Sequence, residues 1–136
     1  MTTTISFSGI NWPAVLVIIV LSFILGAFWH SVLFKKGWSE DSKSIYNGEN
    51  HGNPFAIFGL SALLHIIAII GLALFIGNNS TASTGLLKGF IISTVWVSTS
   101  IGVTYLFVGR TFRLFLIDAG FYVVFLSLAG LILGAW

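Results

Sequence analysis

The sequence predicts an all-α integral membrane protein, a four-helix transmembrane bundle, on three observations. Charged residues make up 7% of the chain and hydrophobic residues 57%, whereas a soluble domain carries roughly 25% charged residues. The charges gather in short windows that separate four long apolar runs. Each run holds about 22–23 residues, which as a helix would measure about 33–35 Å and cross a ~30 Å hydrocarbon core. We therefore expect residues 1–136 to form a single transmembrane domain with spans at about 13–34, 54–76, 86–108 and 114–136.

The first two spans begin with the same pair of helix-start residues. Asn11 comes shortly before Pro13, and Asn53 directly precedes Pro54. Asparagine is a favoured N-cap, and proline suits the first helical turn because its missing N–H would be unpaired there anyway. The first apolar run is longer than the hydrophobic region of a signal peptide, and no Lys or Arg precedes it. We therefore expect it to be a retained transmembrane helix.

The last two spans are placed by the residues before them. Ser83 and Thr84 are the candidate caps of the third span, and a short basic turn at residues 109–113 precedes the fourth. The segment at residues 35–53 is polar, charged and rich in Gly and Asn, and is expected to be a linker. The spans must be helical, because a bilayer core offers no water to backbone groups and these segments do not alternate as barrel strands do.

The positions of the basic residues predict which way the bundle faces. Two linkers lie on one side and hold most of them: Lys35, Lys36, Lys43, Arg110 and Arg113. Lys88 belongs to the other side, where its side chain can extend to the interface. By the positive-inside rule, the basic loops are cytoplasmic and both termini lie outside. Trp12 and Trp136 would then lie at the outer interface, and Trp38 and Tyr46 near the inner one.

Composition and motifs argue against several classes of function. A net charge of +2 is too small to indicate nucleic-acid binding, and the absence of cysteine excludes disulfides and thiolate chemistry. No catalytic, phosphate-binding or dinucleotide-binding motif occurs, so no catalytic residue and no cofactor is assigned. No metal site is expected either. His51 lies in a loop and His65 about 16 Å deep in the second span, too far apart for both to join His30 on one ion.

Ionisable residues inside the predicted spans are the main candidates for function, because burying a charge in lipid is expensive. His30 and Asp118 each lie about four residues, or roughly 6 Å, from the inner end of their spans. They could therefore meet at one level of the bundle. The alternative is that Asp118 pairs with Arg110 or Arg113 at the interface, or is simply hydrated there.

His65 lies near the middle of the second span, with Ser61 one turn away on the same face. Such a histidine could relay protons, because imidazole titrates near neutral pH. Alternatively, it is a neutral side chain that hydrogen-bonds a Ser or Thr of the third span, which is ordinary in membrane helix packing. The complete candidate intramembrane polar site comprises His30, His65, Asp118, Ser61 and Tyr122.

Small residues spaced by four predict close helix packing in three of the spans. The packing candidates are Ser22, Gly26, Thr94, Ser98, Gly102, Gly130 and Gly134. Small side chains let helix backbones approach closely, which drives association in lipid, although such stripes could instead line a hydrated path. Stripes left exposed on so small a bundle would favour self-association or docking on a larger membrane complex.

Several segments together carry a family resemblance. They are residues 11–15 (NWPAV), 26–34 (GAFWHSVLF) with Trp38, 113–121 (RLFLIDAGF) and 130–136. In these segments the chain resembles the uncharacterised bacterial membrane family known as domain of unknown function number 1761. The resemblance implies a small four-span protein of the bacterial inner membrane and brings no activity with it. His30 and Val32 replace the tyrosine and proline of the family's typical W-Y-S-P, whereas Asp118 lies in a matching segment.

Three functions remain open from the sequence. The favoured one is a non-enzymatic protein of the lipid bilayer that acts by helix packing, as a homo-oligomer or an accessory subunit. The second is a small channel or proton-coupled transporter that uses His65 and Asp118. The third is an enzyme that acts on lipid at the inner interface through His30 and Asp118, which would require these side chains to lie within about 8 Å of each other.

Overall fold

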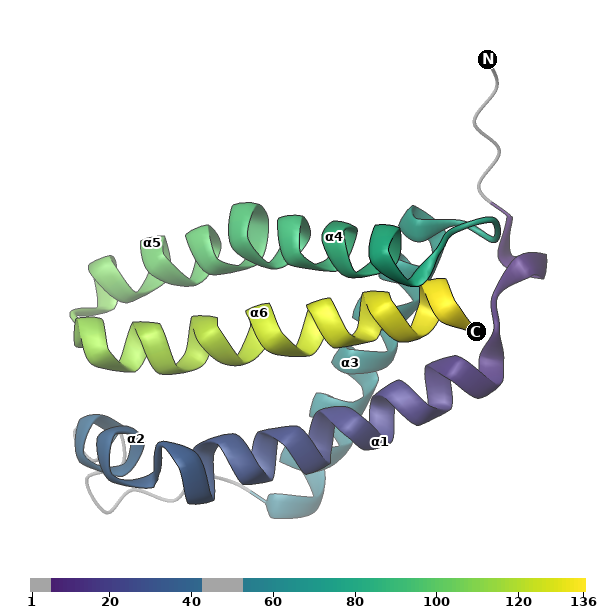
Figure 1. Ribbon diagram of the computed structural model, residues 1–136. Helices are drawn as coiled ribbons and strands as arrows, with labels where there is room; N and C mark the ends of the chain where they lie inside the picture. Colours follow the sequence, from purple (N-terminus) through teal and green to yellow (C-terminus); the bar gives the residue numbers. More distant parts are fainter. Residues whose placement is uncertain (1–5, 43–52) are drawn as a thin grey trace.

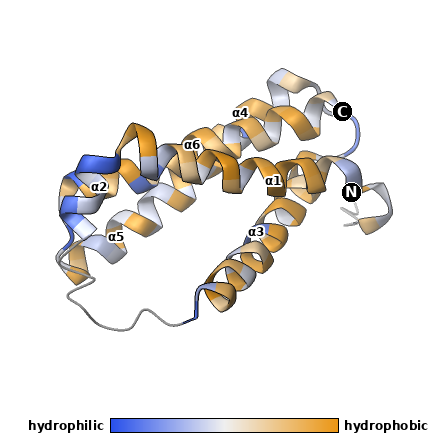
Figure 2. Ribbon diagram, turned by 90° about the horizontal axis from the view of Figure 1, so that it is seen from below, coloured by the Kyte–Doolittle hydropathy of each residue, from blue (hydrophilic) through white to orange (hydrophobic). Residues whose placement is uncertain are grey.

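The computed structural model describes residues 6–42 and 53–136, and these are helices joined by short turns. Within them, four helical stretches are long and apolar enough to cross a membrane: Trp12–Leu33, Pro54–Ile76, Ala82–Val108 and Phe112–Ala135. The expected fold class, all-helical with four candidate spans, is therefore confirmed. Figure 2 shows hydrophobic residues along these long helices and hydrophilic residues around a short helix at one end.

The elements follow one another along the chain without long interruptions among the described residues (Figure 1). Their order is the 3₁₀ turn η1 (Phe7–Gly9), α1 (Trp12–Phe28), the π-helical turn η2 (Trp29–Leu33), α2 (Lys35–Ser42), α3 (Pro54–Ile76), α4 (Ala82–Ile92), the π-helical turn η3 (Ser93–Ser98), α5 (Thr99–Val108) and α6 (Phe112–Ala135). The first span is thus α1 with η2, and the third is α4, η3 and α5 in one continuous run.

Side-chain caps begin each of the long helices. Asn11 accepts a hydrogen bond from the backbone N–H of Ala14 at 3.1 Å, and Asn53 caps α3 in the same way, so both predicted caps are confirmed. The third span begins earlier than predicted, because Thr81 rather than Ser83 or Thr84 caps it. Its hydroxyl is the first in the run S-T-A-S-T that can reach the N–H groups of the first helical turn.

The prediction of a plain linker after the first span is wrong over its first half. Lys35–Ser42 forms helix α2, which packs against α6. Gly37 faces α6 closely, since a Cβ atom there would lie 3.2 Å from the Ile117 side chain. Glu40 and Asp41, in the next turn of α2, bind the start of α6 through Arg113. Tyr46, Lys43 and His51 fall outside the described residues.

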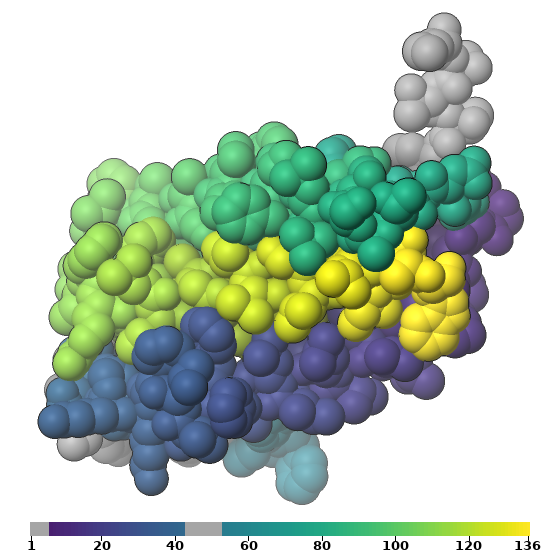
Figure 3. Space-filling model, viewed as in Figure 1, coloured from purple at the N-terminus to yellow at the C-terminus, as the bar shows by residue number. Residues whose placement is uncertain are grey.

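Helix α6 is the centre of the fold. It packs against α1, α2, α3, α4 and α5, and Figures 1 and 3 show it between α1–α2 on one side and α4–α5 on the other. Its buried residues recur on several faces: Leu114, Ile117, Ala119, Phe121, Phe125, Leu126, Ala129 and Gly130. Phe125 contributes to the main core together with Ile18 of α1 and Ile69 of α3. A helix that is apolar all round and covered on most sides is expected at the centre of a bundle.

Four glycines, two on α4 and two on α6, bring the backbones of these helices into contact. A Cβ atom added to Gly85 would overlap the carbonyl oxygen of Gly130, and one added to Gly130 would overlap that of Gly85. A Cβ atom added to Gly89 would likewise overlap the carbonyl oxygen of Leu126, and one added to Gly134 would overlap that of Thr81. We call Gly85, Gly89, Gly130 and Gly134 the glycine seam. Gly130 and Gly134 were packing candidates, but their partner helix supplies two further glycines that the sequence reasoning did not single out.

The glycine seam corrects the argument for self-association. Gly130 and Gly134 face α4 of the same chain, so this stripe is not left free for a second copy. Ser22 is buried in α1 with its hydroxyl bonded to Ile19, and Gly26 faces the ring of Phe121. In the third span, the hydroxyls of Thr94 and Ser98 return to carbonyls of their own helix, and Gly102 faces Phe115. Gly26, Gly102, Gly130 and Gly134 therefore face other helices of the same chain, whereas the bonds of Thr94 and Ser98 stay within their own helix.

Helix α3 crosses the other spans obliquely (Figures 1 and 2). Its second half packs into the core through Ile69, Leu72 and Ile76, whereas every residue from 54 to 60 is exposed. The packed end is tied to α4 by Lys88, whose Nζ donates to the carbonyl oxygen of Ile76 at 3.1 Å. Lys88 thus satisfies the carboxyl end of α3 rather than simply extending to the interface.

Candidate functional site

His30 and Asp118 are in direct contact, as their depths in the predicted spans suggested. His30 belongs to η2 and Asp118 to the first third of α6, and Nε2 of the ring lies 3.1 Å from Oδ1 of the carboxylate. The two side chains are 25% and 18% exposed, so both are largely shielded. A partly buried ion pair of this kind gains more from its partner than an exposed one does.

The other ring nitrogen of His30 fixes how protons are arranged. Nδ1 lies 3.0 Å from the carbonyl oxygen of Gly26, which can only accept a hydrogen bond, so Nδ1 carries a proton. In neutral imidazole Nε2 then has a lone pair and no proton. Its contact with Asp118 therefore requires one further proton, located either on Nε2 or on the carboxyl group. The pair holds one exchangeable proton and is neutral overall when it is present.

Tyr105 completes this group, and sequence reasoning missed it. Its hydroxyl donates to Oδ2 of Asp118, on the side of the carboxyl opposite to His30. Gly109, with φ of 74°, ends α5 in the left-handed region and turns the chain tightly into α6. Residues at equal separation from such a turn lie opposite each other in the two antiparallel helices. Tyr105 lies four residues before Gly109 and Asp118 nine residues after it, so this relation alone does not pair them. We call His30, Asp118 and Tyr105 the polar cluster.

The π-helical turn η2 positions the first span against this cluster. Its wider ring is closed by the N–H of Phe34 bonding to the carbonyl oxygen of Trp29 at 2.9 Å, five residues back. Trp29 and His30 are neighbours in sequence, yet both contact α6: the indole Nε1 of Trp29 donates to the carbonyl oxygen of Ile117 at 2.9 Å. Turns of this kind are rare and frequently occur at functional sites.

The polar cluster opens onto a cavity of about 740 Å³ between α1, α3, α5 and α6. The cavity exists because the first half of α3 diverges from the other spans. Its polar lining comprises Ser22, His30, Ser31, Ser61, His65, Tyr105, Asp118 and Tyr122, and its aromatic lining Phe23, Trp38, Phe58 and Phe121. All five candidates of the intramembrane polar site therefore line one cavity. Two pairs among them are bonded: His30 with Asp118 through their side chains, and His65 with the backbone of Ser61.

His65 bonds to Ser61 and not to the third span. Its Nδ1 lies 2.7 Å from the backbone carbonyl oxygen of Ser61, one turn earlier, so the bond uses the backbone rather than the hydroxyl. Nε2 is buried and makes no hydrogen bond to the described residues. Its ring lies between Phe23 and Phe125, with centroids 5.9 and 5.5 Å away. The expected bond to a Ser or Thr of the third span is not formed, because those hydroxyls bond within their own helix.

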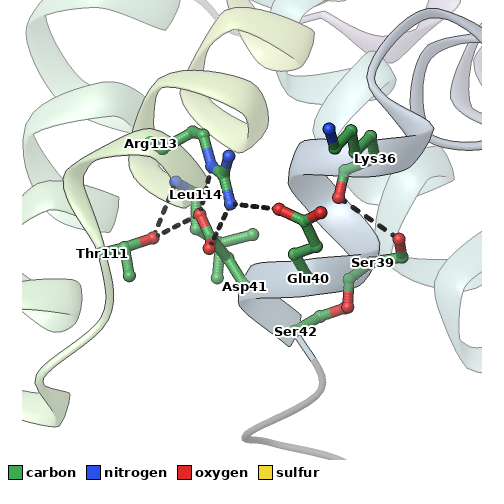
Figure 4. A network of polar contacts seen from close by, with 8 residues as sticks. All are labelled: Lys36, Ser39, Glu40, Asp41, Ser42, Thr111, Arg113 and Leu114. Atoms are coloured by element: carbon green, nitrogen blue, oxygen red, sulfur yellow. Dashed lines mark hydrogen bonds and ion pairs between the residues drawn. The ribbon is translucent and has the colours of Figure 1, made fainter.

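Arg113 does not pair with Asp118, because it is bound to α2. Its guanidinium grips Asp41 through two hydrogen bonds of 2.6 and 2.8 Å and reaches Glu40 at 3.1 Å (Figure 4). Thr111 also donates to Asp41, at 2.7 Å. These bonds, first from Arg113 and then from Thr111, lower the pKa of the Asp41 carboxyl from 3.8 to about 2. We call Asp41, Glu40, Thr111 and Arg113 the surface network.

No group of three or more metal-binding side chains gathers in residues 6–42 and 53–136. His51, the third histidine, lies outside these residues. The distance between His30 and Asp118 meets the geometric condition of the enzyme hypothesis. One histidine and one carboxyl group nevertheless do not define a reaction without a bound substrate.

Residues 13–134 match the family described as "Protein of unknown function (DUF1761)". The chain belongs to this family. The match covers all four spans and includes the whole polar cluster and the glycine seam. No curated protein and no solved structure matches the chain. Membership of DUF1761 thus agrees with the resemblance noted in the sequence, and its description assigns no activity.

Proposed function

We propose that this DUF1761 protein is a small proton-coupled membrane transporter whose proton site is the His30–Asp118 pair. The observation that carries the proposal is the fixed tautomer of His30. Because Nδ1 bonds to the carbonyl oxygen of Gly26, the pair must share one exchangeable proton at the wall of a cavity. A site that gains and loses one proton beside a cavity is the minimum that proton coupling requires.

The energetic cost of such a group supports a role beyond packing. Ionisable side chains within membrane spans are expensive, and those that persist commonly serve proton or ion movement. The glycine seam already supplies close packing on α6 without any ionisable group. His30 and Asp118 are therefore not needed simply to hold the helices together.

The direction of the protein in the membrane follows from its charges. Lys35, Lys36, Arg110 and Arg113 lie at the α2 end of the bundle, whereas Lys88 lies at the other end. The positive-inside rule then places the α2 end, and with it the polar cluster, near the cytoplasmic face, with both termini outside. We infer the bacterial inner membrane as the site of action, since this orientation gives the cluster access to cytoplasmic protons.

Proton flux into proteoliposomes tests this function. Purified protein is reconstituted with an internal pH-sensitive dye, and a potassium diffusion potential drives protons inward. Wild type should acidify the lumen faster than empty liposomes do, and Asp118→Asn and His30→Gln should reduce the rate to the empty-liposome level. Ser127→Ala is the matched control, because among the described residues the Ser127 hydroxyl bonds only to Val123 of its own helix. Equal rates in wild type and Asp118→Asn would contradict the proposal.

A second candidate, a homo-oligomeric or accessory subunit, is favoured by the exposed part of α3. Residues 54–60 are apolar apart from their glycine and are exposed throughout, and no described segment covers them. A neighbouring protein could cover this surface, as lipid could. Native mass measurement in lipid nanodiscs tests whether a second copy of this chain covers the surface. A monomer at all protein concentrations would argue against such a homo-oligomer.

A further inference from the structure

We propose that the cavity beside the polar cluster binds a lipophilic organic cation, which takes the place of the proton shared by His30 and Asp118. This inference rests on the proposed proton-coupled function and names the class of its substrate. It is carried by the charge of the cavity wall, by the chemistry of its lining and by its volume.

The charge balance of the cavity favours a cation. Asp118 is the only carboxyl group on its wall among the described residues, and the histidines that face it are His30 and His65. Tyr105 and Tyr122 are the other titratable groups there, from α5 and α6, while α2 contributes the uncharged Trp38. Arg110 lies beyond the end of α5 and interacts electrostatically with Tyr105, but it does not line the cavity. Loss of the shared proton therefore leaves one negative charge to be neutralised.

The lining selects an organic cation over a metal ion. Calcium and magnesium sites usually include carboxylate ligands, and no group of three or more His, Cys, Asp or Glu side chains gathers in the described residues. The cavity offers aromatic rings from α1, α3, α5 and α6 and from α2 instead: Phe23, Trp38, Phe58, Tyr105, Phe121 and Tyr122. Aromatic faces attract cations, and the attraction grows where water is excluded. One carboxylate among aromatic rings is therefore suited to a large cation with little hydration.

The volume and the second histidine agree with this class of ligand. Sites for small organic molecules usually span about 300–1,000 Å³, and the cavity measures about 740 Å³. Nε2 of His65 is a buried acceptor on the same wall without a partner among the described residues. It can accept a hydrogen bond from an ammonium N–H, so protonated lipophilic amines belong to the class along with cations that carry no N–H.

The exchange balances in protons and in charge. Before binding, the pair holds one proton and is neutral. The cation enters beside Asp118 and the proton leaves, so the carboxylate, the neutral imidazole and the cation again sum to zero. His30 keeps its Nδ1 bond to Gly26 throughout. Each cation bound thus releases one proton, and protons and cations compete for the same carboxylate.

Tetraphenylphosphonium is the probe, because its charge does not change with pH and any pH dependence then belongs to the protein. Binding to protein in nanodiscs is measured by calorimetry between about pH 5.5 and 7.5, in buffers of different ionisation enthalpy that count released protons. We expect saturable binding above that of empty nanodiscs, release of about one proton, and up to about tenfold tighter binding per pH unit while the pair is protonated. Tetraphenylborate has the same shape and the opposite charge, and should bind no better than to empty nanodiscs.

Variants distinguish loss of the cation site from loss of folding. Asp118→Asn should abolish saturable binding and proton release, whereas Asp118→Glu should keep both, and Ser127→Ala should match wild type. The proton count in wild type is decisive even if Asp118→Asn fails to fold. Binding without proton release, equal binding of tetraphenylborate, or no saturable binding overturns the inference. Proton flux without cation binding overturns this inference alone. Cation binding without any proton flux, measured with tetraphenylphosphonium present, overturns the proposed function and leaves a cation site.

Discussion

The two ends of α6 are built in opposite ways. Toward its last turns, the glycine seam brings α6 and α4 so close that no methyl group fits between them. Toward its first turns, the same helix borders a cavity of about 740 Å³ and carries Asp118. The first region gains stability from close backbone contact, while the second gives up packing to leave room beside an ionisable pair. One helix thus anchors the fold at one end and presents a site at the other.

The contrast shows where stability and function can be separated in this protein. Substitutions in the glycine seam should act mainly on stability, because its residues face backbone of the neighbouring helix and do not line the cavity. Substitutions around the cavity should change the polar cluster while the anchored end keeps the helices together. Substitutions in both regions test this separation of stability from function, and their expected effects on stability range from large to small.

Gly130→Ala should give the largest loss. The new Cβ would overlap the carbonyl oxygen of Gly85, which is backbone and cannot turn away. We expect the free energy of unfolding to fall by about 3 kcal/mol, at the upper end of overpacking costs, as measured by thermal or denaturant unfolding in detergent. Gly59→Ala is the control, since nothing lies within 4 Å of a Cβ there. Equal stability of the two variants would mean that the seam is not closely packed.

Tyr105→Phe should have an intermediate effect, because it leaves one oxygen of Asp118 without its donor. Hydrogen bonds to charged groups contribute about 1.5–3 kcal/mol, and partial exposure of the cluster favours the lower value. Tyr122→Phe is the comparison: its hydroxyl makes no hydrogen bond in the described part of the chain, and its loss should be nearly neutral. A smaller loss for Tyr105→Phe than for Tyr122→Phe would contradict the proposed geometry of the polar cluster.

Lys88→Met should cost less, about 1 kcal/mol, by removing the ammonium group from the carboxyl end of α3. Methionine keeps most of the side chain's apolar length, so the loss reports the capping bonds rather than packing. Lys88→Arg should retain most of the stability. Unfolding curves of the three proteins in the same detergent provide the measurement, and a Lys88→Met protein as stable as wild type would show that water caps α3 equally well.

The hydrogen bonds of the surface network should be lost in acid and should be insensitive to pH near neutrality. The folded-state pKa of Asp41 is lowered to about 2, so its contribution is complete above the ordinary value and is lost as the pH falls toward about 2. Because the network is exposed, we expect a local release of α2 rather than unfolding. The chain has no cysteine, so spin labels at Lys36→Cys and Phe112→Cys can report the separation of α2 from α6.

The wild-type protein and one control variant define the outcome of this experiment. The distance between the labels should be constant from neutral pH down to about 4 and then lengthen. In an Asp41→Asn background it should already be long and should not change with pH. A distance that changes near neutral pH would indicate that another group, rather than Asp41, holds α2 in place.

The sequence predicted the spans well because the bilayer imposes strong and local requirements. Scarce charge, run length and the caps at Asn11 and Asn53 depend only on neighbouring residues. The depth of His30 and Asp118 was also predictable, since a helix has a fixed rise per residue. The meeting of these two side chains could therefore be anticipated as a possibility before their facing was known.

The remaining features depend on how the helices face each other. Tyr105 was missed because its contact with Asp118 depends on how α5 faces α6, which the spacing across Gly109 does not fix. Gly85 and Gly89 were missed because their importance arises only from α6 lying opposite. Helix α2 was hidden by its polar composition, and it is held by contacts with Arg113 that are far apart in sequence. The π-helical turn η2 has no local sequence signature that we could use.

The central position of α6 also bears on how the protein is made. It follows the other three spans in the chain, yet it packs against every one of them. A ribosome therefore delivers α1, α3 and the α4–α5 run to the bilayer before the helix that joins them has emerged. Until then His30 and Tyr105 lack their carboxylate partner, and the glycines of α4 lack the helix that packs on them. The contacts that join the spans can therefore form only after the last of them has been made.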